Sequence, residues 1–211
     1  MHGLDHILKS LPDFIDEAIV VDNGSTDGSI EIAKKYNAKL LIEETRGYGM
    51  ALSKGLKNVT GDTVIIMDGD GSYRTDALMG ILITMEKNGI DFISGCRFPL
   101  NEYHIMPIEN IMCNYFISWI TRLMFRINVR DMQSGMLVFK NNILEEVKTR
   151  NTGMGFSQEI KIRAWRNRKI HCKEIHIPLN RRIGRTKFRK VRDSLSILYD
   201  LLKLKFKVDK K

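Results

Sequence analysis

The residues of this chain with the clearest chemistry are two aspartates, Asp68 and Asp70, which directly follow a short apolar run. That run, Val64-Ile65-Ile66-Met67, is typical of a buried β-strand, and a glycine follows each aspartate. Side chains two residues apart on an extended chain point to the same side, so the two carboxylates can face one point. Carboxylates, water and phosphate oxygens together suit Mg²⁺ or Mn²⁺. The spacing predicts a metal site for a diphosphate, with a plain surface turn as the alternative.

The bulk composition describes an ordinary globular protein of about one domain. The chain has 211 residues, of which 43% are hydrophobic and 28% are charged, and it contains no P-loop sequence. Its three cysteines, Cys96, Cys113 and Cys172, lie far apart, which indicates reduced thiols in a cytosolic compartment. The first residues lack the basic segment and apolar core of a signal peptide. The most apolar segment, 105–125, contains several polar residues and predicts an amphipathic helix rather than a transmembrane span.

The positive charge of the chain lies at its C-terminal end. Residues 181–211 contain 12 Lys and Arg against 3 Asp and Glu, whereas residues 1–180 contain 22 of each kind. Such a segment attracts polyanions, namely nucleotide phosphates, anionic lipid surfaces or nucleic acid. Nucleic acid is the least favoured of the three, because the basic region has neither interleaved aromatic residues nor a groove-reading motif. A solvated helix face is the alternative interpretation.

Strand-like and helix-like segments alternate along the chain, which predicts a mostly parallel sheet covered by helices. The strands are expected at 17–21, 39–42, 62–67, 91–94, 136–139 and 171–177. The helices are expected at 4–11, 27–36, 47–58, 76–87, 108–125, 143–147, 158–166 and 191–206. We expect Phe116 and Trp119 on a packed helix face, with contact of Tyr115 and Trp119 to a lipid tail as the alternative.

Three polar clusters directly follow predicted strands, at 22–25, 68–70 and 95–97. Parallel α/β sheets bind ligands at the carboxyl ends of their strands. We therefore expect the three clusters to line one crevice.

Several motifs resemble those of family 2 glycosyltransferases, in the order found in that family. The segment Val20–Gly28 resembles the nucleotide-binding turn, and the double aspartate resembles the metal motif. Four further segments, at 94–98, 131–135, 155–159 and 182–187, resemble the polyprenyl-phosphate sugar synthases, a group that includes dolichyl-phosphate mannosyltransferase. The resemblance covers about residues 4–200. It implies a GT-A fold in residues 1–189, followed by a basic C-terminal helix or tail in residues 190–211.

The resemblance also implies roles for individual residues. The nucleotide of the donor would be bound by Asp22, Asn23, Gly24 and Asp68. The Mg²⁺ or Mn²⁺ ion would be held by Asp68 and Asp70. The residues at the phosphate and acceptor would be Arg97, Arg182 and Lys187, with Asp131, Gln133 and Glu159 as the catalytic group. The alternatives from the residues alone are an ion pair for each arginine, loop bracing for Asp131 and Gln133, and a helix-dipole role for Glu159.

The sequence departs from the family at two places. Related enzymes begin with a strand of the type Val-Ser-Val-Val-Ile-Pro-Ala-Tyr-Asn-Glu, but here residues 4–11 already match the first helix. The resemblance implies that this first strand is missing from the middle of the sheet, through either a start codon placed late or a degenerate chain. Ser72 also stands where some relatives place a glutamine on the metal.

These observations predict a metal-dependent, inverting transfer of mannose or glucose, from GDP-mannose or UDP-glucose, to a polyprenyl (dolichyl) phosphate. An acceptor phosphate is already an anion and needs positioning only, whereas a sugar hydroxyl would need Asp131 or Glu159 as a base. The basic C-terminal helix predicts a cytoplasmic protein with peripheral contact to the inner face of an anionic membrane. The alternatives are a transferase for a soluble, glycan or protein acceptor, and a non-catalytic nucleotide-binding relic.

Overall fold

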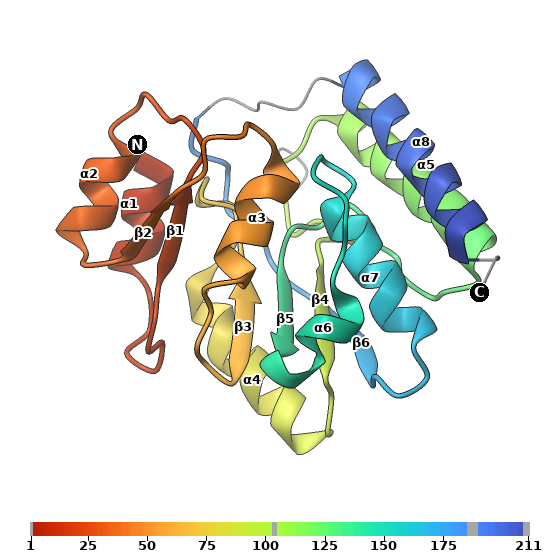
Figure 1. The fold of residues 1–211 in the computed structure, drawn as a ribbon, viewed down its shortest axis with the longest axis horizontal. Helices are drawn as coiled ribbons and strands as arrows, with labels where there is room; N and C mark the ends of the chain where they lie inside the picture. Colours follow the sequence, from red (N-terminus) through yellow and green to blue (C-terminus); the bar gives the residue numbers. More distant parts are fainter. Residues whose placement is uncertain (1, 103–104, 185–189, 209–211) are drawn as a thin grey trace.

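The computed structural model describes residues 2–102, 105–184 and 190–208 (Figure 1). Its strands are β1 (Ile19–Asp22), β2 (Lys39–Ile42), β3 (Thr63–Ile66), β4 (Phe92–Cys96), β5 (Leu137–Lys140) and β6 (Cys172–His176). Its α-helices are α1 (His2–Lys9), α2 (Ser29–Lys35), α3 (Tyr48–Leu56), α4 (Leu78–Lys87), α5 (Ile108–Phe125), α6 (Leu144–Val147), α7 (Phe156–Arg166) and α8 (Lys190–Val208). Two short 3₁₀ turns, η1 (Thr75–Ala77) and η2 (Asn141–Ile143), lead into α4 and α6.

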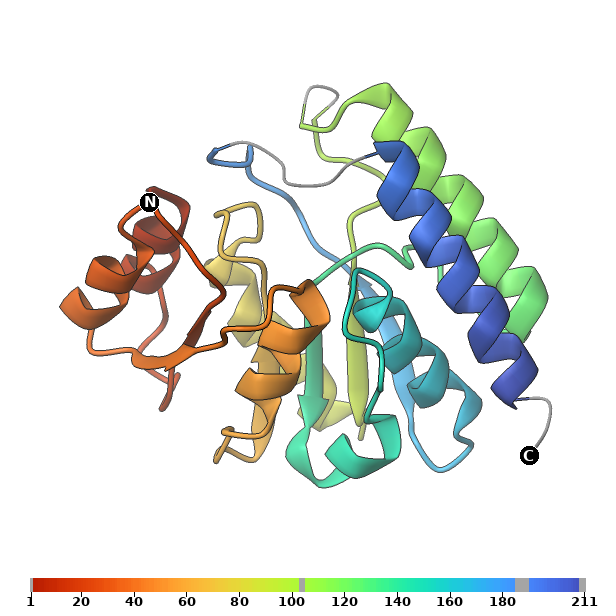
Figure 2. The same ribbon diagram turned by 45° about the horizontal axis from the view of Figure 1, so that its top comes forward.

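The described strands form two sheets rather than one. β1 and β2 make a parallel pair, and the larger sheet has the order β3-β5-β4-β6. Within the larger sheet β4 and β6 are parallel, and β5 runs antiparallel to both of its neighbours. Figures 1 and 2 place the small sheet on the β3 side of the larger one. The sheet is therefore interrupted between β1 and β3, and the interpretation of this interruption as a missing first strand stays a prediction.

Helices cover both faces of the larger sheet, as the sequence predicts. On β3, Val64 and Ile66 pack with α6 and α7, whereas Ile65 and the following Met67, just beyond the strand, pack on the side of α4. This alternation follows from the two-residue period of a strand, which places successive side chains on opposite faces. The sheet is therefore buried on both sides, and the loops at its ends are left to build a site.

A third apolar cluster joins the paired helices α5 and α8 to the rest of the molecule. Their inner side chains, among them Ile117, Phe125, Ile197 and Leu201, pack with Ile162 of α7. Both views show α5 and α8 side by side as an outer layer (Figures 1 and 2). None of the helices in the described ranges is long and apolar enough to cross a membrane.

One prediction about α5 is wrong. Phe116 and Trp119 do not lie on a packed face, because their side chains are 52% and 58% exposed. The helix faces the core with Ile117, Thr121 and Phe125 instead. Apolar residues occur on both sides of α5, so periodicity alone does not identify the buried side.

Candidate functional site

Asp68 and Asp70 lie just beyond the end of β3, each in contact with a different part of the chain. One carboxylate oxygen of Asp70 accepts a hydrogen bond from the backbone N–H of Ser72 at 2.9 Å. The other oxygen forms an ion pair with the guanidinium of Arg182. The structure therefore brings Arg182, predicted as a phosphate-binding residue, directly onto the predicted metal motif.

The segment that carries Arg182 runs alongside the aspartate loop. The backbone N–H of Asn180 donates to the carbonyl of Ser72 at 2.8 Å, and that of Ile183 donates to the carbonyl of Asp70 at 3.0 Å. These bonds hold residues 179–183 against residues 70–73, so the position of Arg182 is fixed by backbone contacts. Lys187, the other predicted phosphate residue of this segment, lies outside the described residues.

Asp68 is a carboxylate with an unfavourable charge balance. Burial raises its pKa above the ordinary value, the neighbouring Asp70 raises it further, and Arg182 and Arg97 oppose the change. The ionised form of Asp68 is therefore disfavoured chiefly by burial and also by the charge of Asp70. A divalent cation at this point would relieve the repulsion between the two carboxylates.

Two residues lie close to the carboxylate of Asp68. A Cβ atom added to Gly135 would lie 2.9 Å from both carboxylate oxygens, so a side chain at this position would displace them. On another side, the hydroxyl of Tyr48 lies 3.5 Å from Oδ1 of Asp68 and 3.1 Å from Oγ of Ser157. Gly135 and Tyr48 together form a cradle for this carboxylate.

The donor set fits a divalent cation that also binds a diphosphate. Among the described residues, no group of three or more His, Cys, Asp or Glu side chains is arranged to hold a metal ion. Asp68 and Asp70 would therefore hold Mg²⁺ or Mn²⁺ only with oxygens from water and from a ligand. Hard oxygen donors from carboxylates, water and phosphate are those that Mg²⁺ prefers.

Arg97 and Asp131 form a buried ion pair next to this site. Nε and Nη2 of Arg97 donate to the two carboxylate oxygens of Asp131 at 2.8 Å each, and the backbone N–H of Arg97 adds a bond of 2.9 Å. The Asp131 side chain is fully buried and that of Arg97 is 13% exposed. Burial raises the pKa of Asp131, but the Arg97 guanidinium outweighs it, so the pKa lies below the ordinary value. Asp131 is held ionised and already accepts three hydrogen bonds.

Lys161, a residue that the sequence pattern did not single out, is hydrogen-bonded to the backbone of the loop that carries Asp131. Its buried Nζ donates to the backbone carbonyls of Asp131 and Ser134 at 2.8 Å and to that of Met132 at 3.3 Å. Burial lowers the pKa of Lys161 to about 8, while Asp131 acts in the opposite direction. One detectable signal is its position in α7, where Lys161 stands between Ile160 and Ile162.

The predicted nucleotide turn follows β1. The carboxylate of Asp22 accepts hydrogen bonds from the backbone N–H groups of Gly24 at 3.1 Å and Ser25 at 3.2 Å. The amide of Asn23 donates to two backbone carbonyls of the loop after β2, and it accepts from the N–H of Gly47 at 2.8 Å. Gly24 has a φ of 79°, which favours glycine at this point of the turn. The turn is thus joined to the start of α3, which also carries the Tyr48 hydroxyl near Asp68.

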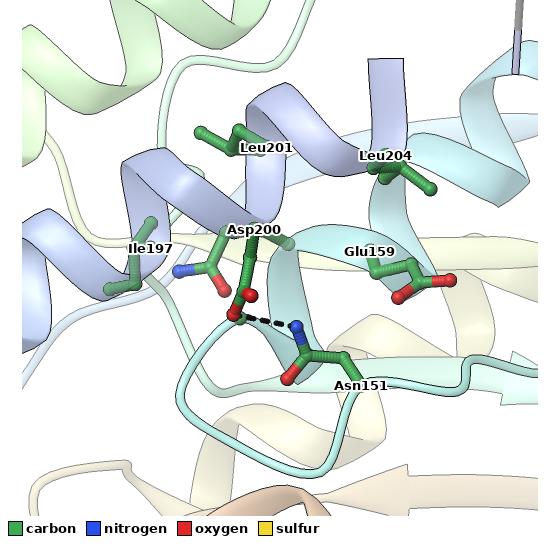
Figure 3. A pocket seen from close by; sticks show the side chains of 8 residues that line it. Asn151, Glu159, Ile197, Asp200, Leu201 and Leu204 are labelled. Carbon is green, nitrogen blue, oxygen red and sulfur yellow. Dashed lines mark hydrogen bonds between the residues drawn. The ribbon is translucent and has the colours of Figure 1, made fainter. Parts of the chain in front are cut away.

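The predicted catalytic group also contains Gln133 and Glu159. Among the described residues, neither side chain forms a hydrogen bond or an ion pair with Asp68 or Asp70. The amide of Gln133 is hydrogen-bonded to that of Gln158. Glu159 forms an ion pair with Arg163 one turn further along α7, at 2.6 Å. Glu159 also lines a small recess between α7 and α8, where Asp200 accepts a hydrogen bond from Asn151 at 2.8 Å (Figure 3).

Comparison with known proteins gives one matching family and several relatives. The profile described as Glycosyl transferase family 2 matches residues 3–147. The chain is 30% identical to a dolichyl-phosphate hexose transferase of Haloferax volcanii over 172 residues, which are 81% of this chain and 73% of the relative. It is also 30% identical to an uncharacterised glycosyltransferase of Mycobacterium bovis over 147 residues, or 70% of this chain. The match spans 66% of the length of that mycobacterial relative.

Solved structures share the fold at lower identity. Glucosyl-3-phosphoglycerate synthase from Mycobacterium tuberculosis, in complex with Mn²⁺, UDP-glucose and phosphoglyceric acid, superposes with a TM-score of 0.75 at 17% identity. The superposition covers 95% of this chain and 74% of the synthase. These structures are GT-A glycosyltransferases, which confirms the predicted fold class. The profile match and the archaeal relative establish that this chain belongs to glycosyltransferase family 2.

Proposed function

We propose that this chain is a metal-dependent, inverting hexosyltransferase that moves mannose or glucose from a nucleotide-diphosphate sugar to a polyprenyl (dolichyl) phosphate. The observation that carries the proposal is the pair of carboxylates just beyond β3, where Asp70 is paired with Arg182 and Asp68 lies in the cradle formed by Gly135 and Tyr48. The similarity to the archaeal dolichyl-phosphate hexose transferase supports the choice of a lipid phosphate acceptor.

The proposed donor site takes its parts from the two sheets. Asp22, Asn23 and Gly24 at the end of β1 would contact the nucleotide. Asp68 and Asp70 at the end of β3 would hold Mg²⁺ or Mn²⁺ against the diphosphate. Bound there, the cation supplies charge neutralisation for the leaving diphosphate. Solved GT-A structures that contain Mn²⁺ or Mg²⁺ with UDP support this arrangement.

The state of the candidate bases favours an acceptor that is already an anion. Asp131 is held ionised with both oxygens bound by Arg97, and Glu159 is paired with Arg163. A hydroxyl acceptor would need a carboxylate that can take up its proton. A phosphate nucleophile needs only positioning, which we assign to Arg97, Arg182 and Lys187, while Asp131 and Gln133 shape the pocket around the sugar.

The test is a transfer assay with the purified full chain. Dolichyl phosphate is offered with radiolabelled GDP-mannose or UDP-glucose, with Mn²⁺ or with a chelator, and lipid-linked hexose is extracted and counted. We expect product with one of the two donors, and we expect the chelator to abolish it. Phosphoglyceric acid and a free hexose serve as soluble acceptors in parallel. Product on a soluble acceptor alone would refute the lipid assignment, and no binding of GDP or UDP with Mn²⁺ would identify a non-catalytic relic.

Gly135→Ala is expected to weaken Mn²⁺-dependent nucleotide binding by roughly tenfold or more, because the new methyl group moves the Asp68 carboxylate. Isothermal titration of GDP or UDP with Mn²⁺ measures the change. Gly80→Ala is the matched control, because nothing lies within 4 Å of a Cβ atom on this α4 glycine. Equal affinity of Gly135→Ala and the unsubstituted chain would contradict the proposed position of the metal.

A lipid acceptor places the reaction at a membrane surface. We therefore propose that residues 1–189 form the transferase domain, and that the basic segment 190–211, which contains α8, brings this domain to the cytoplasmic face of an anionic membrane. The concentration of the net positive charge in residues 181–211 supports this orientation.

A further inference from the structure

The helix α5 has an apolar side that does not face the protein. Its buried side consists of Ile117, Ser118, Thr121 and Phe125. Six large apolar residues lie on the opposite side, each more than half exposed: Ile108, Met112, Tyr115, Phe116, Trp119 and Leu123. Their spacing of three and four residues places them in one stripe along the helix. A helix that only covered the core would carry polar residues there.

The neighbouring helix α8 repeats this pattern. Ile197, Leu201 and Leu204 are buried, whereas Leu195, Tyr199, Leu202 and Phe206 are between 51% and 70% exposed. The exposed four are again spaced by four and three residues, opposite the buried three. Because α5 and α8 lie side by side, the two stripes belong to one outer layer of the molecule (Figures 1 and 2). We call these ten side chains the outer apolar face.

Exposed apolar residues are common singly, but ten on two adjacent helices are not. Extended apolar surface of this kind marks contact with a protein or a membrane. Trp and the two Tyr residues of the outer apolar face combine a large ring with a polar tip, a combination enriched at the membrane–water interface. The composition of the face therefore favours lipid.

The charge around the outer apolar face distinguishes a membrane from a second copy of the chain. Arg122, Arg126 and Lys203 are exposed on or next to these helices, and the whole net charge of +9 lies in residues 181–211. Two copies meeting through this face would bring like charges together. An anionic bilayer would instead attract the cations while it takes up the apolar side chains.

We propose that the outer apolar face of α5 and α8 is a docking surface for an anionic lipid bilayer, with both helices lying in the plane of the interface. This inference deepens the proposed function and rests on it for its purpose, because it places the transferase where a polyprenyl phosphate resides. The inference adds α5 to the membrane contact. Both α5 and the basic C-terminal helix would insert exposed apolar side chains into the lipid.

Vesicle flotation of the full chain tests the proposal. Vesicles are made of phosphatidylcholine alone or of phosphatidylcholine with phosphatidylglycerol. The test variant is Leu123→Ser with Leu202→Ser, which removes one exposed residue from each helix and keeps Trp119 as a fluorescent reporter. The matched control is Met79→Ser with Ile83→Ser on α4, because these two apolar residues are 47% and 42% exposed away from the face.

We expect the unsubstituted chain and the α4 control to float with the anionic vesicles, with a blue shift of tryptophan emission. The α5–α8 variant should bind about tenfold more weakly, and high salt should release all three. Equal flotation of the variant and the control would overturn the proposal. Two other results would also overturn the proposal. One is a failure of the unsubstituted chain to float, and the other is a dimer in light scattering that the α5–α8 variant no longer forms.

Nucleotide titration of the same proteins separates this proposal from the proposed function. Vesicle binding without Mn²⁺-dependent GDP or UDP binding would refute the transferase and leave the docking surface in place. Nucleotide binding and transfer to dolichyl phosphate in detergent, without vesicle binding, would refute the docking surface alone.

Discussion

Asp131→Asn is expected to lower the free energy of unfolding by about 3–5 kcal/mol, the largest change in stability that we predict. The substitution removes the negative charge that compensates Arg97. The guanidinium of Arg97, which is only 13% exposed, then lacks its charged partner. Natural domains have a total stability of roughly 5–15 kcal/mol, so the variant should be close to unfolding. Urea titration followed by circular dichroism measures the change.

The same pair predicts a dependence on acid. The pKa of Asp131 is lower in the folded chain than the ordinary value of 3.8. Its contribution to stability is therefore complete above the ordinary value, and it is lost as the pH falls towards the folded pKa. Asp131→Asn should remove this part of the acid sensitivity. Glu145→Gln is the control, because the Glu145–Lys148 pair is exposed and should contribute less than about 1 kcal/mol. A small loss for Asp131→Asn would show that the pair does not organise the loop.

Asp68→Asn is expected to have opposite effects on activity and on stability. Transfer should fall by roughly 100- to 1,000-fold, because the donor diphosphate loses a charged ligand of its cation. Stability without metal should stay equal or rise, because burial and Asp70 disfavour the ionised form of Asp68. A raised carboxyl pKa contributes stability below the unfolded value and loses it as the pH rises through the folded value, so an uncharged amide removes this penalty.

Thermal unfolding with and without Mn²⁺ and nucleotide measures both effects of Asp68→Asn. The ligands should raise the melting temperature of the unsubstituted chain and leave that of the variant unchanged, because only the folded state with an intact site binds them. Asp76→Asn is the matched control, since this aspartate is exposed and paired with Arg74 on the surface. A variant that keeps its metal-dependent shift would exclude Asp68 from the site.

The sequence predicts elements well where a local pattern determines them. The bounds of β2 and α5 agree with the prediction, because β2 is a short apolar run before two glutamates and α5 begins directly after Pro107. The start of α2 is an error of the same local kind. The sequence predicts a helix from residue 27, but α2 begins at Ser29, with Gly28 at the cap position and the N–H of Ser29 bonded to Asp27.

The contacts within the site could not be predicted in the same way. Arg97 and Asp131 are 34 residues apart, and the resemblance implies a separate role for each, with an ion pair of Arg97 as an alternative that names no partner. Their pairing depends on how the loops after β4 and before β5 approach each other. Lys161 was missed because a lysine in a helix is usually solvated, and its three carbonyl acceptors come from a loop almost 30 residues upstream. Long-range packing decides both cases.

The interruption between β1 and β3 has a consequence for how the molecule unfolds. A two-stranded sheet is only marginally stable by itself, so β1 and β2 depend on the helices packed against them. The small sheet should therefore open before the larger one, with faster amide hydrogen exchange along Ile19–Asp22 than along Phe92–Cys96. Under the proposed donor position, the nucleotide contacts one cooperative unit and the metal the other. Binding of the donor substrate would then couple the two sheets, so that they unfold as one cooperative unit.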